Sequence, residues 1–189
     1  LATLYPVVTV TGPRQAGKTT LSRATFPEKP YVSLEPLDVR ESAVSDPRGF
    51  LAQFPNGAII DEVQRAPGLA SYLQSEVDER PTPGRFILTG SQHLALSATV
   101  SQSLAGRTGV LELFPPSWRE LKRFPAASHN LFDVLWAGSY PRIFDRQIPA
   151  HQWLSDYVAT YVQRDVRQML TVGDLRTFTN FLRLCAGST

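Results

Sequence analysis

Residues 12 to 19 carry the clearest chemical signal in this sequence. They read Gly-Pro-Arg-Gln-Ala-Gly-Lys-Thr, which is the spacing G-x-x-x-x-G-K-T. Glycines let such a loop turn its N–H groups toward an anion, and the N-terminus of a following helix favours negative charge. At this spacing Lys18 is expected to reach the β- and γ-phosphates, and Thr19 to bind Mg²⁺. The segment therefore predicts a nucleoside triphosphate site formed by Gly12, Pro13, Arg14, Gln15, Ala16, Gly17, Lys18, Thr19 and Thr20.

An acidic pair, Asp61 and Glu62, follows the apolar run 58–60. Phosphoryl transfer to water needs a carboxylate near the metal ion and a base for the attacking water. Asp61 is predicted to hold Mg²⁺, directly or through water, and Glu62 to orient and deprotonate the attacking water. The alternative is structural, with the pair capping the helix expected near Pro67.

Hydroxyl and guanidinium groups flank two later apolar runs. Thr89 and Ser91 follow the run 85–88, at the edge where parallel sheets bind ligands, and either could sense the γ-phosphate or hold the water. Ser91 could also cap the next helix. Arg107 precedes the run 109–113 and is a candidate arginine finger for its own site or for that of a neighbouring subunit. A solvated arginine at a helix C-terminus is the alternative for Arg107, and Arg14 is a second finger candidate.

Strands alternating with helices must position these residues. The β-branched run 5–11 predicts a strand, and 18–26 predicts a helix ended by Pro27. Further strands are expected at 31–34, 58–62, 85–88 and 109–113, separated by helical or turn-rich segments. This alternation predicts an α/β fold with a parallel sheet.

Two consecutive prolines at 115–116 mark a boundary, because they can continue neither a central strand nor a helix interior. We expect a nucleotide-binding core over 1–116 and a helical region over 117–189. Within that region Asn130 and Asp133 predict a helix start.

Near the end of the sequence Leu175, Phe178, Phe181, Leu182 and Cys185 have the spacing of one apolar helix face. We expect that face to pack on the preceding helix or on a neighbouring molecule, or to belong to an ordinary core helix. The single cysteine, Cys185, allows no internal disulfide and is expected to be a packing residue.

Five segments together resemble the sequence motifs of a known protein family. They are Gly-Pro-Arg-Gln-Ala-Gly-Lys-Thr-Thr at 12–20, Ile-Ile-Asp-Glu-Val-Gln at 59–64, Leu-Thr-Gly-Ser at 88–91, Ser-Leu-Ala-Gly-Arg at 103–107 and Tyr-Val-Ala-Thr-Tyr-Val-Gln-Arg-Asp-Val at 157–166. The set resembles the prokaryotic AAA-type ATPases that carry a C-terminal domain of unknown function. This resemblance implies a P-loop core with strand order 5-1-4-3-2, a small helical region after it, ATP and Mg²⁺ as ligands, and Arg107 as the finger. It also implies that this chain is the N-terminal portion of a longer protein, without its C-terminal domain.

The residues and the resemblance together predict a Mg²⁺-dependent ATPase that couples hydrolysis to a conformational change in an attached domain or partner. A non-hydrolysing nucleotide switch and a phosphotransferase are the alternatives, and a DNA-linked role is left open. A homo-oligomer or a protein partner is also expected.

Composition sets further bounds. With 42% hydrophobic and 19% charged residues the chain can bury one core, and its net charge of +2 does not by itself indicate nucleic acid. The three histidines stand far apart in sequence, which argues against a metal cluster. No apolar run approaches the roughly twenty residues of a membrane span, so the cytoplasm is expected.

Overall fold

The computed structural model describes residues 1–90, 103–128, 130–161 and 175–187. The chain divides into two compact units, Leu1–Ser117 and Trp118–Thr189, called here the core unit and the helical unit. In the described ranges no helix has the length and apolar character needed to cross a membrane.

A parallel sheet forms the centre of the core unit. Among the described residues it has five strands in the order β2-β3-β4-β1-β5, which confirms the expected order 5-1-4-3-2. The strands are β1 (Val7–Thr11), β2 (Tyr31–Ser33), β3 (Ile59–Asp61), β4 (Phe86–Thr89) and β5 (Thr108–Glu112). Their central members are buried on both faces, which explains why they read as nearly continuous runs of Val, Ile, Leu and Thr.

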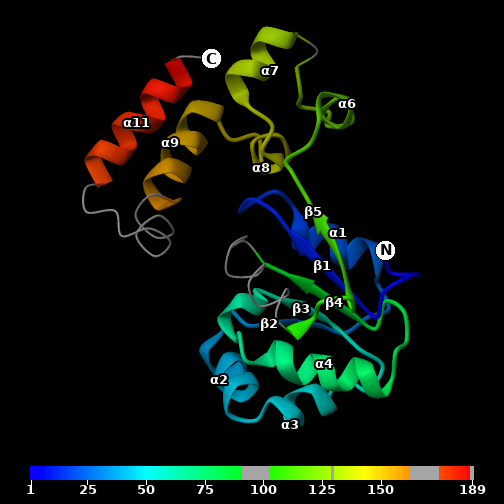
Figure 1. Cartoon of the computed structure of the whole chain (residues 1–189). Helices are drawn as coiled ribbons and strands as arrows, with labels where there is room; N and C mark the ends of the chain where they lie inside the picture. Colours follow the sequence, from blue (N-terminus) through cyan, green and yellow to red (C-terminus); the bar gives the residue numbers. More distant parts are fainter. Residues whose placement is uncertain (91–102, 129, 162–174, 188–189) are drawn as a thin grey trace. The chain divides into compact units, whose positions relative to one another are not determined.

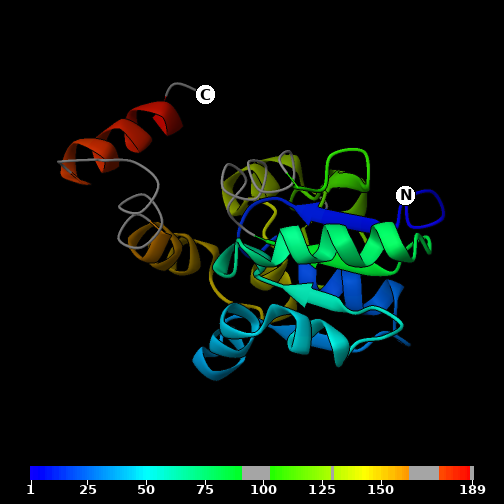
Figure 2. The same cartoon turned by 60° about the horizontal axis from the view of Figure 1, so that its bottom comes forward.

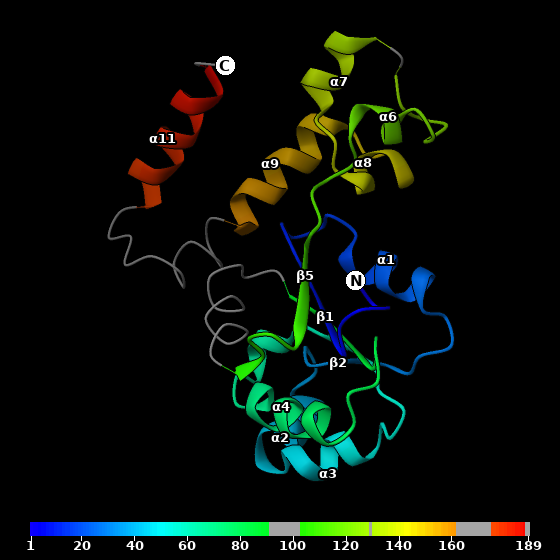
Figure 3. The ribbon, with the colours of Figure 1, turned by 45° about the vertical axis from the view of Figure 1, so that its right-hand side comes forward.

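Helices cover the two faces of this sheet. Helix α1 (Lys18–Thr25) lies on one side, and α2 (Leu37–Ser45), α3 (Pro47–Ala52) and α4 (Leu69–Glu79) lie on the other, with the strands between them (Figure 1; Figure 3). Helix α4 runs along the strand direction (Figure 2).

The alternating side chains of the strands supply both cores. One cluster of buried side chains, made of Val8, Val10, Ile59 and Ile87, has Phe26 packed against it from the end of α1. The larger cluster joins Ile60, Phe86 and Leu88 to apolar residues of α2, α3 and α4. The core unit is therefore the three-layer α/β fold that the alternating pattern predicts.

The helical unit has its own buried cluster. Its helices in the described residues are α6 (Trp118–Leu121), α7 (Leu131–Ala137), α8 (Pro141–Asp145), α9 (Ala150–Tyr161) and α11 (Leu175–Gly187). Asn130 caps α7 as expected, since its side-chain oxygen accepts a hydrogen bond from the Phe132 N–H at 2.9 Å. The rings of Tyr140, Trp153 and Tyr157 lie about 5 Å from one another, and Trp153 belongs to the buried cluster.

Helix α11 differs from the expectation for its apolar face. Phe181 is 56% exposed, and Cys185 is exposed as well. The buried cluster takes its side chains from residues 118–157, and α11 contributes none to it. The expectation that Cys185 is a packing residue is therefore not met within the described residues. Residues 162–174, directly before α11, lie outside the described residues, so packing of the face on the preceding helix stays a prediction. Packing of this face on a neighbouring molecule stays a prediction.

Gly12 connects the end of β1 to the loop at 12–17 and cannot carry a side chain in this position. Its φ is +132°, and an added Cβ would lie 2.0 Å from the carbonyl oxygen of Leu113, just after β5. The close approach of the two backbones at this point fixes where the loop leaves the sheet.

Gly12→Ala should therefore lower the free energy of unfolding by more than about 3 kcal/mol, through steric overlap and backbone strain. Gly68→Ala is the matched control, because Gly68 has a φ of −62° and nothing within 4 Å of an added Cβ. The control should change stability by less than about 1 kcal/mol in urea unfolding. Equal losses in the two variants would contradict this view of Gly12.

Candidate active site

The loop between β1 and α1 folds around the ammonium group of Lys18. Its Nζ donates hydrogen bonds to the carbonyl oxygens of Gly12 at 2.9 Å and Pro13 at 2.7 Å. Gly17 begins α1 with a φ of +99°, and Gln15, at the tip of the loop, also has a positive φ of 63°. The predicted loop residues thus form one compact turn at the carboxyl end of β1.

The other residues predicted in this loop differ in exposure. Ala16 is buried, Arg14 is half-buried, and Gln15 and Thr20 are exposed. A glycine-containing turn ahead of a helix N-terminus, with a buried cation close to it, is suited to bind an oxyanion, because backbone N–H groups and an ammonium both attract negative charge.

Lys18 is only 7% exposed. Burial lowers the pKa of this ammonium below its ordinary value of 10.5, and Arg14 acts in the same direction. The carboxylates of Glu62 and Asp61 oppose this change by raising the pKa of Lys18. A buried cation with a lowered pKa is one that added negative charge would stabilise.

Asp61, at the end of β3, accepts hydrogen bonds from several segments of the core unit. Its Oδ2 accepts from the Thr19 hydroxyl at 2.9 Å and the Tyr31 hydroxyl at 2.8 Å. Its Oδ1 accepts from the Thr89 hydroxyl and, at 3.2 Å, from the backbone N–H of Glu62. The structure therefore brings Thr19, at the start of α1, together with Asp61 and Thr89, at the ends of β3 and β4.

Tyr31 is a site residue that the sequence analysis missed. Its hydroxyl contacts Asp61, while its ring lies 4.9 Å from the guanidinium carbon of Arg23 on α1. Burial, followed by the hydrogen bond to Asp61, raises the pKa of Tyr31 to about 12. The available signal was its place at the start of β2, in register with Ile59, which puts it on the same face of the sheet as Asp61.

Glu62 leaves the strand with an unusual backbone. Its φ of 60° and ψ of 41° are left-handed, a conformation that is uncommon outside glycine and often marks functional sites. The Glu62 carboxylate accepts a hydrogen bond from the side-chain amide of Gln64, a second contact that the sequence analysis missed. Neither acidic side chain caps α4, whose N-cap is Gly68 without a side-chain hydrogen bond, so the capping alternative is not what the structure shows.

Arg107 lies at the amino ends of the strands, whereas the phosphate loop lies at their carboxyl ends. Its carbonyl accepts from the Val7 N–H at the start of β1, whereas the loop follows the end of β1, about 13 Å away at 3.3 Å per residue. Its guanidinium forms a two-point ion pair with Asp78 of α4, at 2.6 and 2.8 Å. The pair raises the pKa of Arg107 and lowers that of Asp78. The structure does not bring Arg107 to the phosphate loop of its own chain.

Ser91 lies outside the described residues, so its predicted role stays a prediction. Among the described residues there is no cluster of three or more His, Cys, Asp or Glu side chains that could hold a metal ion. Thr19 and Asp61 nevertheless offer hydroxyl and carboxylate oxygens in direct contact, which suits Mg²⁺, a cation usually held by few protein oxygens together with phosphates. The donor set at the loop therefore fits this ion.

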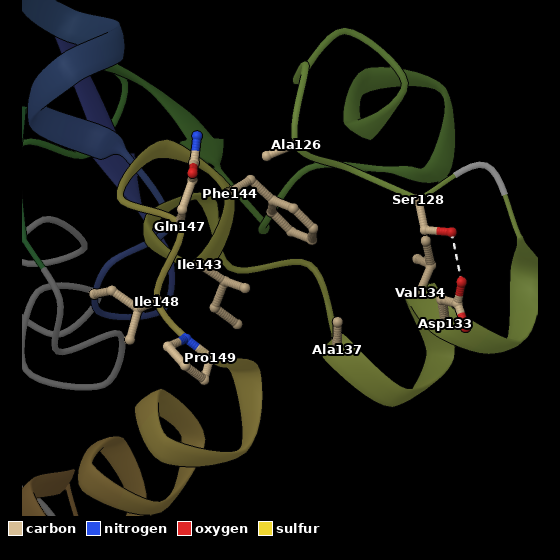
Figure 4. A pocket seen from close by; sticks show the side chains of 10 residues that line it. All are labelled: Ala126, Ser128, Asp133, Val134, Ala137, Ile143, Phe144, Gln147, Ile148 and Pro149. Carbon is tan, nitrogen blue, oxygen red and sulfur yellow. Dashed lines mark hydrogen bonds between the residues drawn. The ribbon is translucent and has the colours of Figure 1, made fainter.

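The helical unit contains a separate cavity of about 410 Å³. Figure 4 shows its lining, which is largely apolar around Val134, Ile143 and Phe144. Two of its three polar lining residues, Ser128 and Asp133, bond to each other at 2.7 Å, and the third is Gln147. Their pairing at the start of α7 has a structural explanation and indicates no reaction.

Residues 4–122, more than half of the chain, match the family model of an AAA domain. The chain belongs to the AAA domain family. Downstream of this AAA domain, residues 128–189 match a model of a domain of unknown function, DUF8612. Both matches confirm the resemblance that the motifs indicate.

Two curated relatives of this AAA protein are the uncharacterized proteins Mb2031c of Mycobacterium bovis and Rv2008c of Mycobacterium tuberculosis. Each is 36% identical over 170 residues, covering 87% of this chain but 37% of the relative's own length. Among solved structures the chain is similar to the Walker-type ATPase PABY2304 of Pyrococcus abyssi, with a TM-score of 0.51 and 16% identity over 87% of this chain and 70% of that one. This likeness shows the fold alone.

The burial of Lys18 leads to a pH prediction. Because its pKa is lowered in the folded protein, the unfolded chain binds more protons between the folded-state pKa and 10.5. Stability from this group should therefore rise as the pH rises through that window. In ¹³C NMR of lysine-labelled protein, the Lys18 signal should titrate below 10.5, and added inorganic triphosphate should raise its midpoint.

The sequence contains only two other lysines, Lys29 and Lys122, whose signals serve as references, and Lys18→Met assigns the signal of interest by removing it. A Lys18 midpoint at or above 10.5 in the free protein would contradict the prediction.

Proposed function

We propose that this AAA domain binds and hydrolyses ATP in the presence of Mg²⁺, and that hydrolysis changes the conformation of an attached domain or partner. The observation that carries the proposal is the 2.9 Å hydrogen bond from Thr19 to Asp61, with Lys18 buried directly before Thr19 and Glu62 directly after Asp61. The choice of ATP over GTP rests on the family, since the sequence shows no motif that recognises the base.

Lys18 and the loop would bind the phosphates. The carbonyl oxygens of Gly12 and Pro13 now accept the hydrogen bonds of Lys18, and phosphate oxygens would replace or join them as acceptors. A bound polyanion also offsets the cost of burying this ammonium, which gives the site an electrostatic preference for phosphate.

Thr19 and Asp61 would hold Mg²⁺, with Thr89 fixing the other carboxylate oxygen. The cation supplies charge neutralisation on the phosphates during transfer. Because Thr89 is fully buried and already bonded to Asp61, we assign it to positioning this carboxylate, and sensing of the γ-phosphate is not part of the proposal.

Glu62 would act as the base that orients and deprotonates the attacking water. Its backbone is left-handed where the strand ends, and the Gln64 side-chain amide donates a hydrogen bond to one of its carboxylate oxygens. A base held by a second polar group is the usual arrangement for directing a water molecule.

Arg107 is proposed as a finger for a neighbouring subunit only, since it lies far from its own loop. Its pairing with Asp78 would keep the guanidinium ordered at the surface until a second subunit approaches. This part of the proposal requires assembly of the protein into an oligomer.

Glu62→Gln should retain binding of a nonhydrolysable ATP analogue and lose phosphate release by about 100-fold or more, because the amide cannot accept the proton of water. Lys18→Ala should weaken the binding itself. Glu79→Gln, an exposed carboxylate at the end of α4, is the matched control and should behave like the parent. If the parent binds nucleotide without turnover, a non-hydrolysing nucleotide switch is favoured. If Glu62→Gln turns over ATP at the parent rate, Glu62 is not the base.

The finger assignment is tested by separating Arg107 from its partner. Arg107→Ala should reduce turnover on the order of 1,000-fold or more, whereas Asp78→Ala should leave the finger available and retain turnover. The parent rate per molecule should rise with protein concentration, as a site completed by a neighbour requires. If both variants turn over like the parent at every concentration, Arg107 is only a surface ion-pair residue.

A further inference from the structure

The hydrogen bonds to Asp61 occupy the positions at which its carboxylate can accept donors. An ionised carboxylate has about four lone-pair directions. Within the described residues Asp61 accepts from four donors, the hydroxyls of Thr19, Tyr31 and Thr89 and the backbone N–H of Glu62. A cation, or a water molecule of its hydration shell, can therefore reach this carboxylate only by taking the place of one of these donors.

These donors differ in their freedom to leave. Thr89 is fully buried in β4, and the Glu62 N–H belongs to the backbone beside Asp61 itself. The Thr19 hydroxyl can bind a cation through its oxygen and still donate its hydrogen to Asp61. Tyr31 is 37% exposed and projects from an edge strand, so its side chain can withdraw with little rearrangement of the core.

The surroundings of Tyr31 favour such a movement. Strand β2 is three residues long and pairs within the sheet only with β3 in the described part of the chain. The ring lies over the guanidinium of Arg23, in the last turn of α1, and that contact tolerates sliding because it has no fixed hydrogen-bond geometry.

We propose that the Tyr31 hydroxyl competes with Mg²⁺ for the Asp61 carboxylate and is displaced when the cation binds with nucleotide. Tyr31 thereby sets the cation requirement of the site and links its occupancy to the contact between β2 and the end of α1. The inference rests on the proposed function, because it concerns the cation of that same site.

Tyr31→Phe removes the competing hydroxyl and keeps the ring on Arg23. Binding of a fluorescent, nonhydrolysable ATP analogue is titrated with Mg²⁺ at fixed nucleotide. The half-saturating Mg²⁺ concentration should fall about threefold to tenfold, the size expected for the net contribution of one hydrogen bond, while analogue binding in EDTA stays unchanged. A Mg²⁺ requirement that is unchanged or higher in Tyr31→Phe overturns the proposal, since the hydroxyl would then be neutral or supportive.

Tyr72→Phe is the matched control. Tyr72, on α4, is 36% exposed and its ring also lies near an arginine, Arg48, so the same hydroxyl is removed from a similar setting away from the site. Its Mg²⁺ requirement should equal that of the parent. A decrease as large as that of Tyr31→Phe would overturn the proposal by showing a nonspecific effect.

A second measurement follows the unsubstituted residue and does not depend on the folding of a variant. In protein labelled with 3-fluorotyrosine, one of the six tyrosine signals is assigned to Tyr31 by its loss in Tyr31→Phe. This ¹⁹F signal should move when Mg²⁺ and the analogue are added together, and much less when the analogue is added in EDTA. If the Tyr31 signal does not move when Mg²⁺ is added with the analogue, the proposal that the cation displaces the Tyr31 hydroxyl is overturned.

The two proposals fail in different ways. If the parent shows no Mg²⁺-dependent nucleotide binding, the proposed function and this inference fall together. If the parent binds with Mg²⁺ and Tyr31→Phe requires as much of the cation as the parent, only this inference falls.

Discussion

The Asp61 carboxylate receives hydrogen bonds from α1, β2 and β4 as well as from the backbone of the following residue. It is 7% exposed, and a buried carboxylate is tolerated only when donors replace the water that it loses. These donors come from three segments far apart in sequence, and their hydrogen bonds to Asp61 hold the segments together at the carboxyl ends of the strands. The position of the phosphate loop relative to β3 and the approach of Tyr31 both follow from this one requirement.

Lys18 and Asp61 are opposite buried charges at the same edge, but they satisfy each other only in part. Lys18 bonds to loop carbonyls and Asp61 to hydroxyls, so both charges are held by neutral groups. A site stabilised in this way is ready to exchange those neutral partners for charged ligands. The same arrangement costs stability relative to an apolar core, which is common where function dictates the residues.

The fold could be predicted closely because its signals are local. Buried parallel strands read as short apolar runs, and the loop at 12–19 places a strand before it and a helix after it. The contact between Thr19 and Asp61 was also predictable, since the carboxyl ends of parallel strands meet at one edge. Tyr31 and Gln64 were not predicted, because a strand tyrosine or a helical-turn glutamine has no local pattern that reveals its distant partner.

Two further differences between the expected and the observed structure, at Arg107 and Cys185, have identifiable causes. The distance of Arg107 from its own loop could have been inferred, because the residue before a parallel strand lies at the opposite edge from the residue after it. The exposure of Cys185 could not, because an apolar spacing shows that a face is suited to packing but does not identify its partner. Such partners depend on parts of the molecule beyond the helix itself.

The place of β1 in the sheet has a consequence during synthesis. This strand pairs with residues 86–89 and 108–112, so its last neighbour in the sheet is synthesised roughly 100 residues after it. At about 5 to 20 residues per second that wait is roughly 5 to 20 s. Until β5 has been made, the side of this apolar β-branched strand that pairs with β5 has no partner, and an unpaired strand edge can pair with another copy of the chain.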